Sequence, residues 1–398
     1  MNPRLSNLHP YPFEKLKQLK QGVELQTDLH HIALSIGEPQ HPMPELIRHV
    51  LVEQIGELTR YPPILGLPEL REAISRWLET RFLLGAASVD PERHVLPVSG
   101  TREALFSFAQ ALINSSENPL VLMPNPFYQI YEGAALLAGA EPRYLDTTAE
   151  NRFLPDLDSV TDDVWKRCSL IYICNPGNPT GAVMDLDQLK KLIGLALRHH
   201  VVIACDECYS EIYRNENNPP PGLLQAAREM GNDQFENCLV FNSLSKRSNA
   251  PGLRSGFVAG DPGIIRQYAR YRSYHGCTMP LPTQKASIAA WSDENHVRKN
   301  RALYRQKFLE FTGILADSWS FETPEAGFYL WPKTPGPDTD FARELFARQN
   351  ITVLPGRFLS RASNGMNPGE NRVRIALVQP LDECVNAAQR IRNYLQTL

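Results

Sequence analysis

The middle of the chain alternates between short apolar runs and longer segments whose apolar residues recur at helical spacing. One such segment carries Leu105, Phe108 and Leu112 on a single helical face. The apolar runs have the length and composition of buried strands and lie at residues 94–98, 120–123, 170–174, 201–205 and 239–241. Because strand follows helix and helix follows strand, we predict an α/β fold with a mostly parallel sheet.

The alternation fades before and after this region. Short strands are expected at residues 32–36, 327–331 and 372–377, and helices at residues 284–291, 296–316 and 381–395. A chain of 398 residues exceeds the size at which a single core keeps growing, so a second, smaller α+β domain is expected. In the last predicted strand Arg372 and Arg374 alternate with apolar residues, so one or both could bind a carboxylate.

Several polar or small residues come directly after the predicted strands. Gly100, Tyr128, Asn178 and Asp206 each follow one, and so does the segment Ser243–Lys246. In mostly parallel sheets ligands bind beyond the carboxyl ends of the strands, so we expect these residues to share one site. Asp206 ends an apolar run and should be partly buried, which requires a partner for its charge. A helix cap or a buried pair with an arginine would also satisfy this aspartate.

The stretch Phe241–Phe257 groups one lysine with side chains that suit a phosphate. Lys246 lies beside Ser243 and Ser245, and Arg254 follows. An arginine fork and serine hydroxyls suit phosphate oxygens, whereas a lysine amine can condense with an aldehyde to a Schiff base. Pyridoxal phosphate (PLP) carries both an aldehyde and a phosphate. Taken alone, the stretch also fits a solvated loop with two ordinary basic residues.

Further binding features lie upstream of this stretch. Gly100, Thr101 and Arg102 link a predicted strand to a helix start, where free N–H groups and the helix dipole face an anion. The chain contains neither GxGxxG nor GxxxxGK[ST], which weakens dinucleotide and nucleoside-triphosphate binding. Tyr128, on a proline-stiffened turn, can offer its ring as a stacking platform. The segment Asn175–Gly181, NPGNPTG, holds amide side chains on a non-helical path.

Charge and composition exclude several classes of partner. The net charge is −3 and no basic tract occurs, so no nucleic-acid partner is expected. No apolar run is long enough to span a membrane, and residues 1–16 contain no apolar signal core, so we expect a cytoplasmic location. The seven cysteines are scattered. Cys205 and Cys208 form a CxxC without a second pair or a nearby histidine, so we expect packing roles and no metal.

Taken in order, these motifs resemble those of the fold-type I PLP-dependent enzymes, and within them the class I and II aminotransferases, over nearly the whole chain. Asn175–Gly181 resembles the family's highly specific NPxNPTG element, and Lys246 resembles its Schiff-base lysine. The resemblance implies an aspartate aminotransferase-like fold. Its parts would be an N-terminal arm and the start of the small domain at residues 1–45, a three-layer α/β/α large domain at 46–275, and a C-terminal small domain at 276–398.

The resemblance also implies roles for individual residues. Asp206 and Tyr209 would hold the pyridinium nitrogen and the ring hydroxyl of PLP and would act with Lys246 in catalysis. Arg374 would grip the substrate α-carboxylate, with help from Gly37 and Asn178. The further implied cofactor contacts are Thr101, Arg102, Tyr128, Asn178, Ser243, Ser245 and Arg254, with Tyr61 reaching the neighbouring active site of a homodimer.

The opening residues, MNPRL followed by HPYPFEKLKQL, and the segment IGEPQHP are similar to those of bacterial N-succinyldiaminopimelate aminotransferases of the lysine and diaminopimelate pathway. This similarity implies amino transfer between glutamate and N-succinyl-2-amino-6-oxopimelate. Tyr11, Phe13 and Tyr329 are candidates for the distal end of the substrate by family placement alone.

Several other activities stay open. Aminotransferases of aspartate, aromatic or alanine type remain alternatives, as do a PLP-dependent C–S β-lyase and a decarboxylase, because fold does not determine the reaction. A ligand-sensing regulator would need an added DNA-binding segment, and a NAD-dependent dehydrogenase would need the missing glycine fingerprint.

Overall fold

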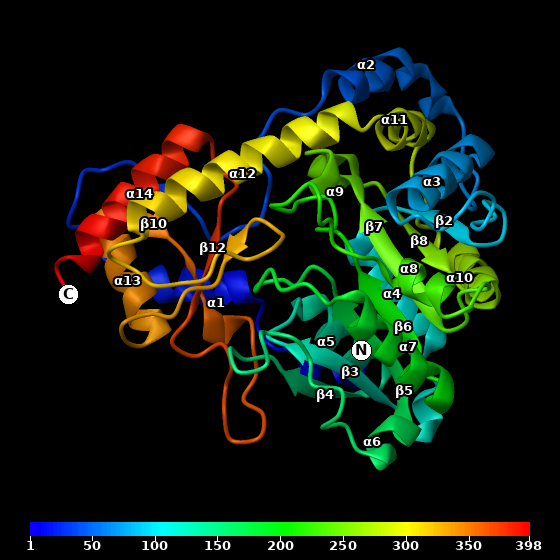
Figure 1. The fold of residues 1–398 in the computed structure, drawn as a ribbon, viewed down its shortest axis with the longest axis horizontal. Helices are drawn as coiled ribbons and strands as arrows, with labels where there is room; N and C mark the ends of the chain where they lie inside the picture. The colour runs from blue at the N-terminus through cyan, green and yellow to red at the C-terminus, as the bar shows by residue number, and fades with distance from the viewer.

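A seven-stranded sheet forms the centre of the larger part of the molecule (Figure 1). The computed structural model describes residues 1–398. The strand order is β2-β8-β7-β6-β5-β3-β4, and every neighbouring pair is parallel except that β8 runs antiparallel to β7 and β2. The predicted mostly parallel sheet is therefore confirmed. The strands are β2 (Val95–Val98), β3 (Leu120–Asn125), β4 (Glu141–Asp146), β5 (Cys168–Cys174), β6 (Val202–Asp206), β7 (Cys238–Ser243) and β8 (Gly256–Gly260).

Helices cover both faces of this sheet, which gives three layers. Along β5, Ile171 and Ile173 pack into one core, whereas Leu170 and Tyr172 pack into the other. Successive side chains of a strand point to opposite faces, so a strand buried on both faces reads as a continuous apolar run. The first core includes residues of α2 (Glu45–Glu53), α3 (Pro68–Arg81), α6 (Asp162–Arg167), α7 (Leu186–His199), α8 (Leu223–Glu229) and α11 (Leu281–Trp291); the second includes residues of α4 (Thr101–Leu112), α5 (Gln129–Ala138) and α10 (Pro262–His275).

A third core lies in the smaller part of the molecule. There β1 (Ile32–Ala33) pairs in parallel with β10 (Ile351–Thr352), and a three-stranded antiparallel sheet has the order β11-β12-β9. Figure 1 shows α12 running from α11 along α14 into this part. The remaining elements are α1 (Pro12–Lys20), α9 (Leu244–Arg247), β9 (Tyr329–Leu330), β11 (Leu354–Pro355), β12 (Val373–Ala376), α12 (Asn295–Leu315), α13 (Asp338–Gln349) and α14 (Leu381–Leu395), with 3-10 turns at Pro3–Asn7, Ile55–Thr59, Ser115–Glu117, Pro251–Leu253 and Gly356–Phe358.

The predicted elements outside the large sheet are present, most of them with different bounds. The last helix is α14 as predicted, whereas α11 begins three residues before its predicted start at 284, because a proline at position 282 suits a first helical turn. The strand predicted at 32–36 ends at Ala33, and the carbonyl of Ser35 instead accepts a hydrogen bond from Arg374. The division into domains stays a prediction. Trp291 of α11 falls within the predicted C-terminal small domain, but its side chain packs into the first core of the large sheet.

None of the helices combines the length and the apolar character needed to cross a bilayer.

Candidate active site

A cavity of about 370 Å³ lies where the carboxyl ends of the parallel strands meet the smaller part of the molecule. Its walls come from the segments after β3, β5, β6 and β7, from the start of α4, from β12 and from the N-terminal arm. The cavity brings together every site residue that the family resemblance implied except Tyr61, namely Gly37, Thr101, Arg102, Tyr128, Asn178, Asp206, Tyr209, Ser243, Ser245, Lys246, Arg254 and Arg374.

Lys246 stands on the one-turn helix α9, directly after β7. Its Nζ donates a hydrogen bond to the carbonyl of Gly37 and lies 5.3 Å from the centroid of the Phe328 ring. Burial lowers the pKa of Lys246 to about 8. A larger fraction of this amine is therefore neutral near physiological pH than for an ordinary lysine, which suits a nucleophile for a carbonyl.

Asp206 ends β6 on the floor of the cavity and is 5% exposed. Its Oδ2 accepts a hydrogen bond from the Tyr131 hydroxyl at 2.9 Å, and its Oδ1 accepts one from the backbone N–H of Cys208 at 3.2 Å. Burial raises the pKa of Asp206, whereas hydrogen bonds from Cys208 and Tyr131 and the charge of Lys246 oppose that rise. A buried carboxylate with two neutral donors still lacks a close cation, and a protonated ring nitrogen would supply one.

The start of α4 and the side chain of Arg254 form a cradle for an anion. Gly100, at φ 87°, precedes the first helical residues and makes no side-chain cap, so the helix N–H groups stay free. A Cβ at Gly100 would overlap the guanidinium of Arg254, so only glycine allows this approach. Ser243 Oγ accepts from the Ser245 N–H at 2.9 Å, which leaves its hydroxyl proton to donate. These donors fit a phosphate.

Arg374 of β12 faces the opposite wall of the cavity. Its Nη1 donates to Asn178 Oδ1 at 3.0 Å and its Nη2 to the Ser35 carbonyl at 2.8 Å, while its Nε is buried without a partner. The guanidinium carbon also lies 4.4 Å from the Tyr329 ring centroid. A held guanidinium with a free donor suits a carboxylate. Arg372 has no part in the cavity, because its Nη1 donates to the Trp331 carbonyl at 2.8 Å.

The hydroxyls of four tyrosines make further contacts at the cavity: two accept hydrogen bonds from Arg102, and two lie against each other. Arg102 donates from Nε to the Tyr128 hydroxyl at 2.7 Å and from Nη2 to the Tyr11 hydroxyl. The hydroxyls of Tyr209 and Tyr329 lie 3.0 Å apart. Gly37 passes so close to this pair that a Cβ there would overlap the Tyr329 hydroxyl and the Phe328 ring.

Tyr61 lies outside the cavity and is fully exposed on the loop before α3. Full exposure of an aromatic side chain in one chain is compatible with the expected contact to a second subunit.

Sequence reasoning assigned no role to several residues that reach the site. Cys208, Gln129 and Leu359 line the cavity, and Tyr131 supports Asp206 from behind. Cys208 could have been found because it follows Asp206 at the strand end. Leu359 carries no such local signal, since only the tertiary fold brings its carbonyl to the N–H of Phe127, where it accepts a hydrogen bond at 3.0 Å.

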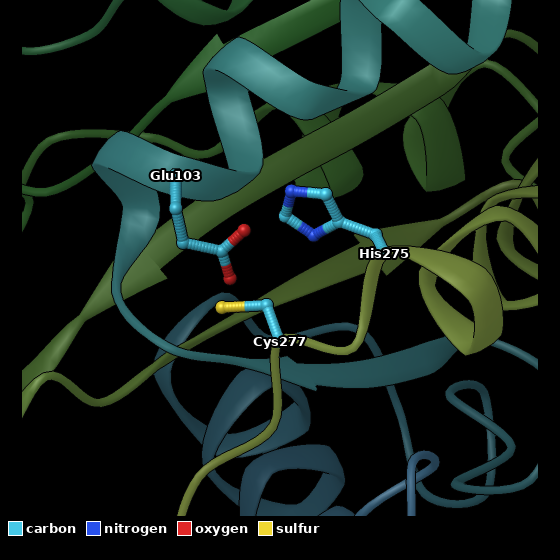
Figure 2. A group of neighbouring side chains, drawn as sticks. All are labelled: Glu103, His275 and Cys277. Carbon is cyan, nitrogen blue, oxygen red and sulfur yellow. The ribbon is translucent and has the colours of Figure 1, made fainter.

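Glu103, His275 and Cys277 form a separate group outside the cavity, and Figure 2 shows their side chains pointing toward one another. One possible ligand atom from each lies within 4.8 Å of the others. However, the Glu103 carboxylate already accepts two hydrogen bonds from Arg272 Nη1, both at 2.9 Å, and one from the Ser99 N–H at 2.9 Å. The buried guanidinium of Arg272 already binds the carboxylate, so Glu103 and Arg272 form an ion pair that fastens α4 to α10.

Comparison with known proteins agrees with this geometry. The family model for aminotransferase class I and II matches residues 30–391. The chain belongs to this family, whose members depend on PLP, and the lysine, the aspartate and the anion cradle of the cavity fit that cofactor.

Several similar proteins are named as aminotransferases, some of them for diaminopimelate substrates. The LL-diaminopimelate aminotransferases of Nitratidesulfovibrio vulgaris (strain DP4) and Aquifex aeolicus (strain VF5) are each 32% identical, covering 98% of this chain and 97% and 98% of their own lengths. An aminotransferase structure from Neisseria meningitidis is 48% identical with a TM-score of 0.95, covering 99% of this chain and 100% of its own. A probable N-succinyldiaminopimelate aminotransferase from Thermus thermophilus is 29% identical with a TM-score of 0.83, covering 96% of this chain and 99% of its own.

Proposed function

We propose that this PLP-dependent aminotransferase moves an amino group between glutamate and N-succinyl-2-amino-6-oxopimelate, forming N-succinyl-diaminopimelate for lysine and diaminopimelate biosynthesis. The observation that carries the proposal is the distribution of charge around the cavity. Arg102, Arg254, Arg374 and Lys246 are its cations, and Asp206 is its only acid.

This charge pattern favours a substrate with carboxylates at both ends and no free ammonium at the far end. Arg254 and the α4 start suit the cofactor phosphate, and Arg374 suits the α-carboxylate. Arg102 then remains for a second carboxylate at the cavity rim, where the hydroxyls of Tyr11 and Tyr128 hold its guanidinium. Both glutamate and the succinylated keto acid carry such a second carboxylate, so one arginine can serve both half-reactions.

We propose a separate role in amino transfer for each of the main residues of the cavity. PLP, when bound, accepts the electrons left behind as the substrate Cα loses its proton. Lys246 Nζ would take that proton from Cα and later return it to the cofactor carbon, a role typically worth ~10²–10⁴ in rate. Asp206 would keep the ring nitrogen protonated, and Tyr209 would hold the ring oxygen. Arg374, together with Asn178, would orient each substrate by its α-carboxylate.

A second candidate is transfer to or from LL-diaminopimelate without a succinyl group, which the names of the 32% identical relatives favour. LL-diaminopimelate keeps a free ammonium at its far end, which needs an acidic partner. Glu38 is not part of the cavity lining. Tyr61, the one residue expected to reach a neighbouring active site, is not an acid either. Because the cavity lining contains no acid besides Asp206, it supports the succinylated substrate.

The test is amino transfer to 2-oxoglutarate from N-succinyl-LL-diaminopimelate, LL-diaminopimelate, aspartate, phenylalanine and alanine at equal concentration. We expect kcat/KM for the succinylated compound to exceed that for each other donor by at least about tenfold, the discrimination that one extra well-placed contact supplies. The variant Lys246→Ala controls for contaminating activity. A preference for LL-diaminopimelate would establish the second candidate, and product formation without any keto-acid acceptor would indicate a lyase.

We also propose that the enzyme acts in the cytoplasm as a homodimer, with Tyr61 completing the neighbouring site. The full exposure of Tyr61 in the single chain supports this. Sedimentation velocity at assay concentration should give a dimer, and Tyr61→Phe should weaken PLP binding without changing the sedimentation coefficient. A fully active monomer would contradict this proposal.

A further inference from the structure

Behind Asp206 stands a tyrosine that no motif assigns to the reaction. Tyr131 belongs to the first turn of α5 and is fully buried. Its hydroxyl donates to Asp206 Oδ2 at 2.9 Å, and it does not line the cavity. It therefore touches the acid and cannot touch a substrate.

Two aromatic neighbours hold Tyr131 in place. Its ring stacks on Tyr172 with centroids 4.7 Å apart and planes 8° apart, and it meets Tyr128 edge-on at 5.7 Å and 86°. The Tyr172 hydroxyl donates to the Leu105 carbonyl at 2.6 Å and takes no part in the hydrogen bond between Tyr131 and Asp206, so Tyr172 supports Tyr131 through its ring. A side chain packed this way has one available rotamer, so its hydroxyl is a pre-positioned donor.

The hydrogen bonds at Asp206 form a complementary pair. The backbone N–H of Cys208 fixes Oδ1, and Tyr131 fixes Oδ2, so the plane of the carboxylate is set by two groups from different elements. Burial raises the pKa of Tyr131 well above its ordinary value, with Asp206 adding to the rise, so the tyrosine stays a proton donor. Its hydrogen bond favours the ionised form of Asp206 against the effect of burial.

We propose that Tyr131 is a positioning residue of the transamination reaction, whose hydroxyl keeps Asp206 ionised and turned toward the ring nitrogen of PLP. This inference rests on the role proposed above for Asp206. Tyr128 is the N-cap residue of α5 and Tyr131 lies in its first turn. The start of this helix therefore supplies both an aromatic wall of the cavity and a hydrogen bond to Asp206.

Tyr131→Phe removes the hydroxyl and keeps the ring. Tyr172→Phe is the matched control, because it also removes one hydroxyl from the same buried stack but leaves Asp206 untouched. We expect Tyr131→Phe to lower kcat by about 10- to 100-fold, the range for a hydrogen bond to a charged group, with KM for glutamate changed less than about threefold. The same variant should raise the Kd of the cofactor-free protein for PLP, and Tyr172→Phe should change neither quantity beyond about twofold.

A double-mutant cycle on the Kd for PLP separates action through Asp206 from simple loss of packing. In the Asp206→Asn background, Tyr131→Phe should change this Kd less than about twofold. An effect of Tyr131→Phe that persists unchanged in that background, or that equals the effect of Tyr172→Phe, overturns the proposal. If Asp206→Asn alone keeps a normal kcat and a normal Kd for PLP, the role proposed for Asp206 is contradicted. If Asp206→Asn impairs the enzyme but Tyr131→Phe does not, only the role proposed for Tyr131 is contradicted. Thermal unfolding midpoints identify any variant that fails to fold.

Discussion

Arg361 and Glu132 join the smaller part of the molecule to helix α5 of the larger part by a buried ion pair. Arg361 Nε lies 2.7 Å from Glu132 Oε1, and the two side chains are only 13% and 4% exposed. Asn125 adds two hydrogen bonds to the backbone of Arg361, accepting at Oδ1 and donating from Nδ2. Leu359, two residues before Arg361, lines the cavity, so the ion pair fastens a segment that contributes to the cavity wall.

Breaking this pair should destabilise the protein and disturb substrate binding. Removing one partner of a buried pair leaves the other charge uncompensated, which costs about 3–5 kcal/mol. We therefore expect Arg361→Ala and Glu132→Gln each to lower the thermal unfolding midpoint and raise KM for glutamate. The double variant should lose less stability than the sum of the two, because the two residues are coupled. Additive losses would show that the pair does not act as a unit.

Lys246→Ala should abolish amino transfer, because no other amine among the cavity-lining residues can bond to the cofactor aldehyde. After treatment with PLP and borohydride, the mass of the wild-type chain should increase by one reduced cofactor, fixed at residue 246. The variant should bind PLP reversibly through its anion cradle and show no such increase. Turnover by the variant would remove Lys246 from its role.

The stability of the cofactor-free protein should depend on pH through Lys246. Burial lowers the folded pKa to about 8 from the ordinary 10.5. Between these values the unfolded chain binds more protons than the folded chain, so stability rises with pH across this window and is lowest below pH 8. Lys246→Met removes the charge, so the cofactor-free variant should be more stable than the cofactor-free wild type at pH 7, by roughly 1–3 kcal/mol. Urea unfolding at pH 7 and at a pH of about 10.5 measures this difference, which should vanish at the higher pH.

Arg374→Lys should weaken the binding of every substrate, because an ammonium cannot reproduce the planar fork that Asn178 and Ser35 hold in place. Losing the buried, hydrogen-bonded pair between Arg374 and the substrate α-carboxylate should cost about 2–5 kcal/mol, so kcat/KM should fall ~30-fold or more. Arg372→Lys is the matched control, since Arg372 lies two residues away outside the cavity. Equal losses in both variants would refute the specific role of Arg374.

Arg102→Gln should discriminate between substrates by their second carboxylate. With glutamate or N-succinyl-LL-diaminopimelate as donor, kcat/KM should fall by at least about tenfold, because Arg102 supplies the charged donor at the cavity rim. With alanine, which has no second carboxylate, the value should change little. A uniform loss for all donors would instead assign Arg102 to the cofactor.

From the sequence alone we predicted five of the seven strands of the central sheet, without β4 and β8, and the residues that lie at its carboxyl edge. Apolar runs between helical segments are local patterns, and Asp206, Asn178 and Lys246 follow such runs directly, so the parallel fold must bring them to one edge. Only the tertiary structure decided that β8 is a strand and runs antiparallel, and that Tyr131 supports Asp206. The strand pattern left Arg372 and Arg374 both open, the family resemblance implied Arg374, and the structure places Arg374 in the cavity lining. These contacts join residues far apart in the chain. They are stabilised by packing and burial in the folded protein, which the local pattern of apolar and polar residues does not predict.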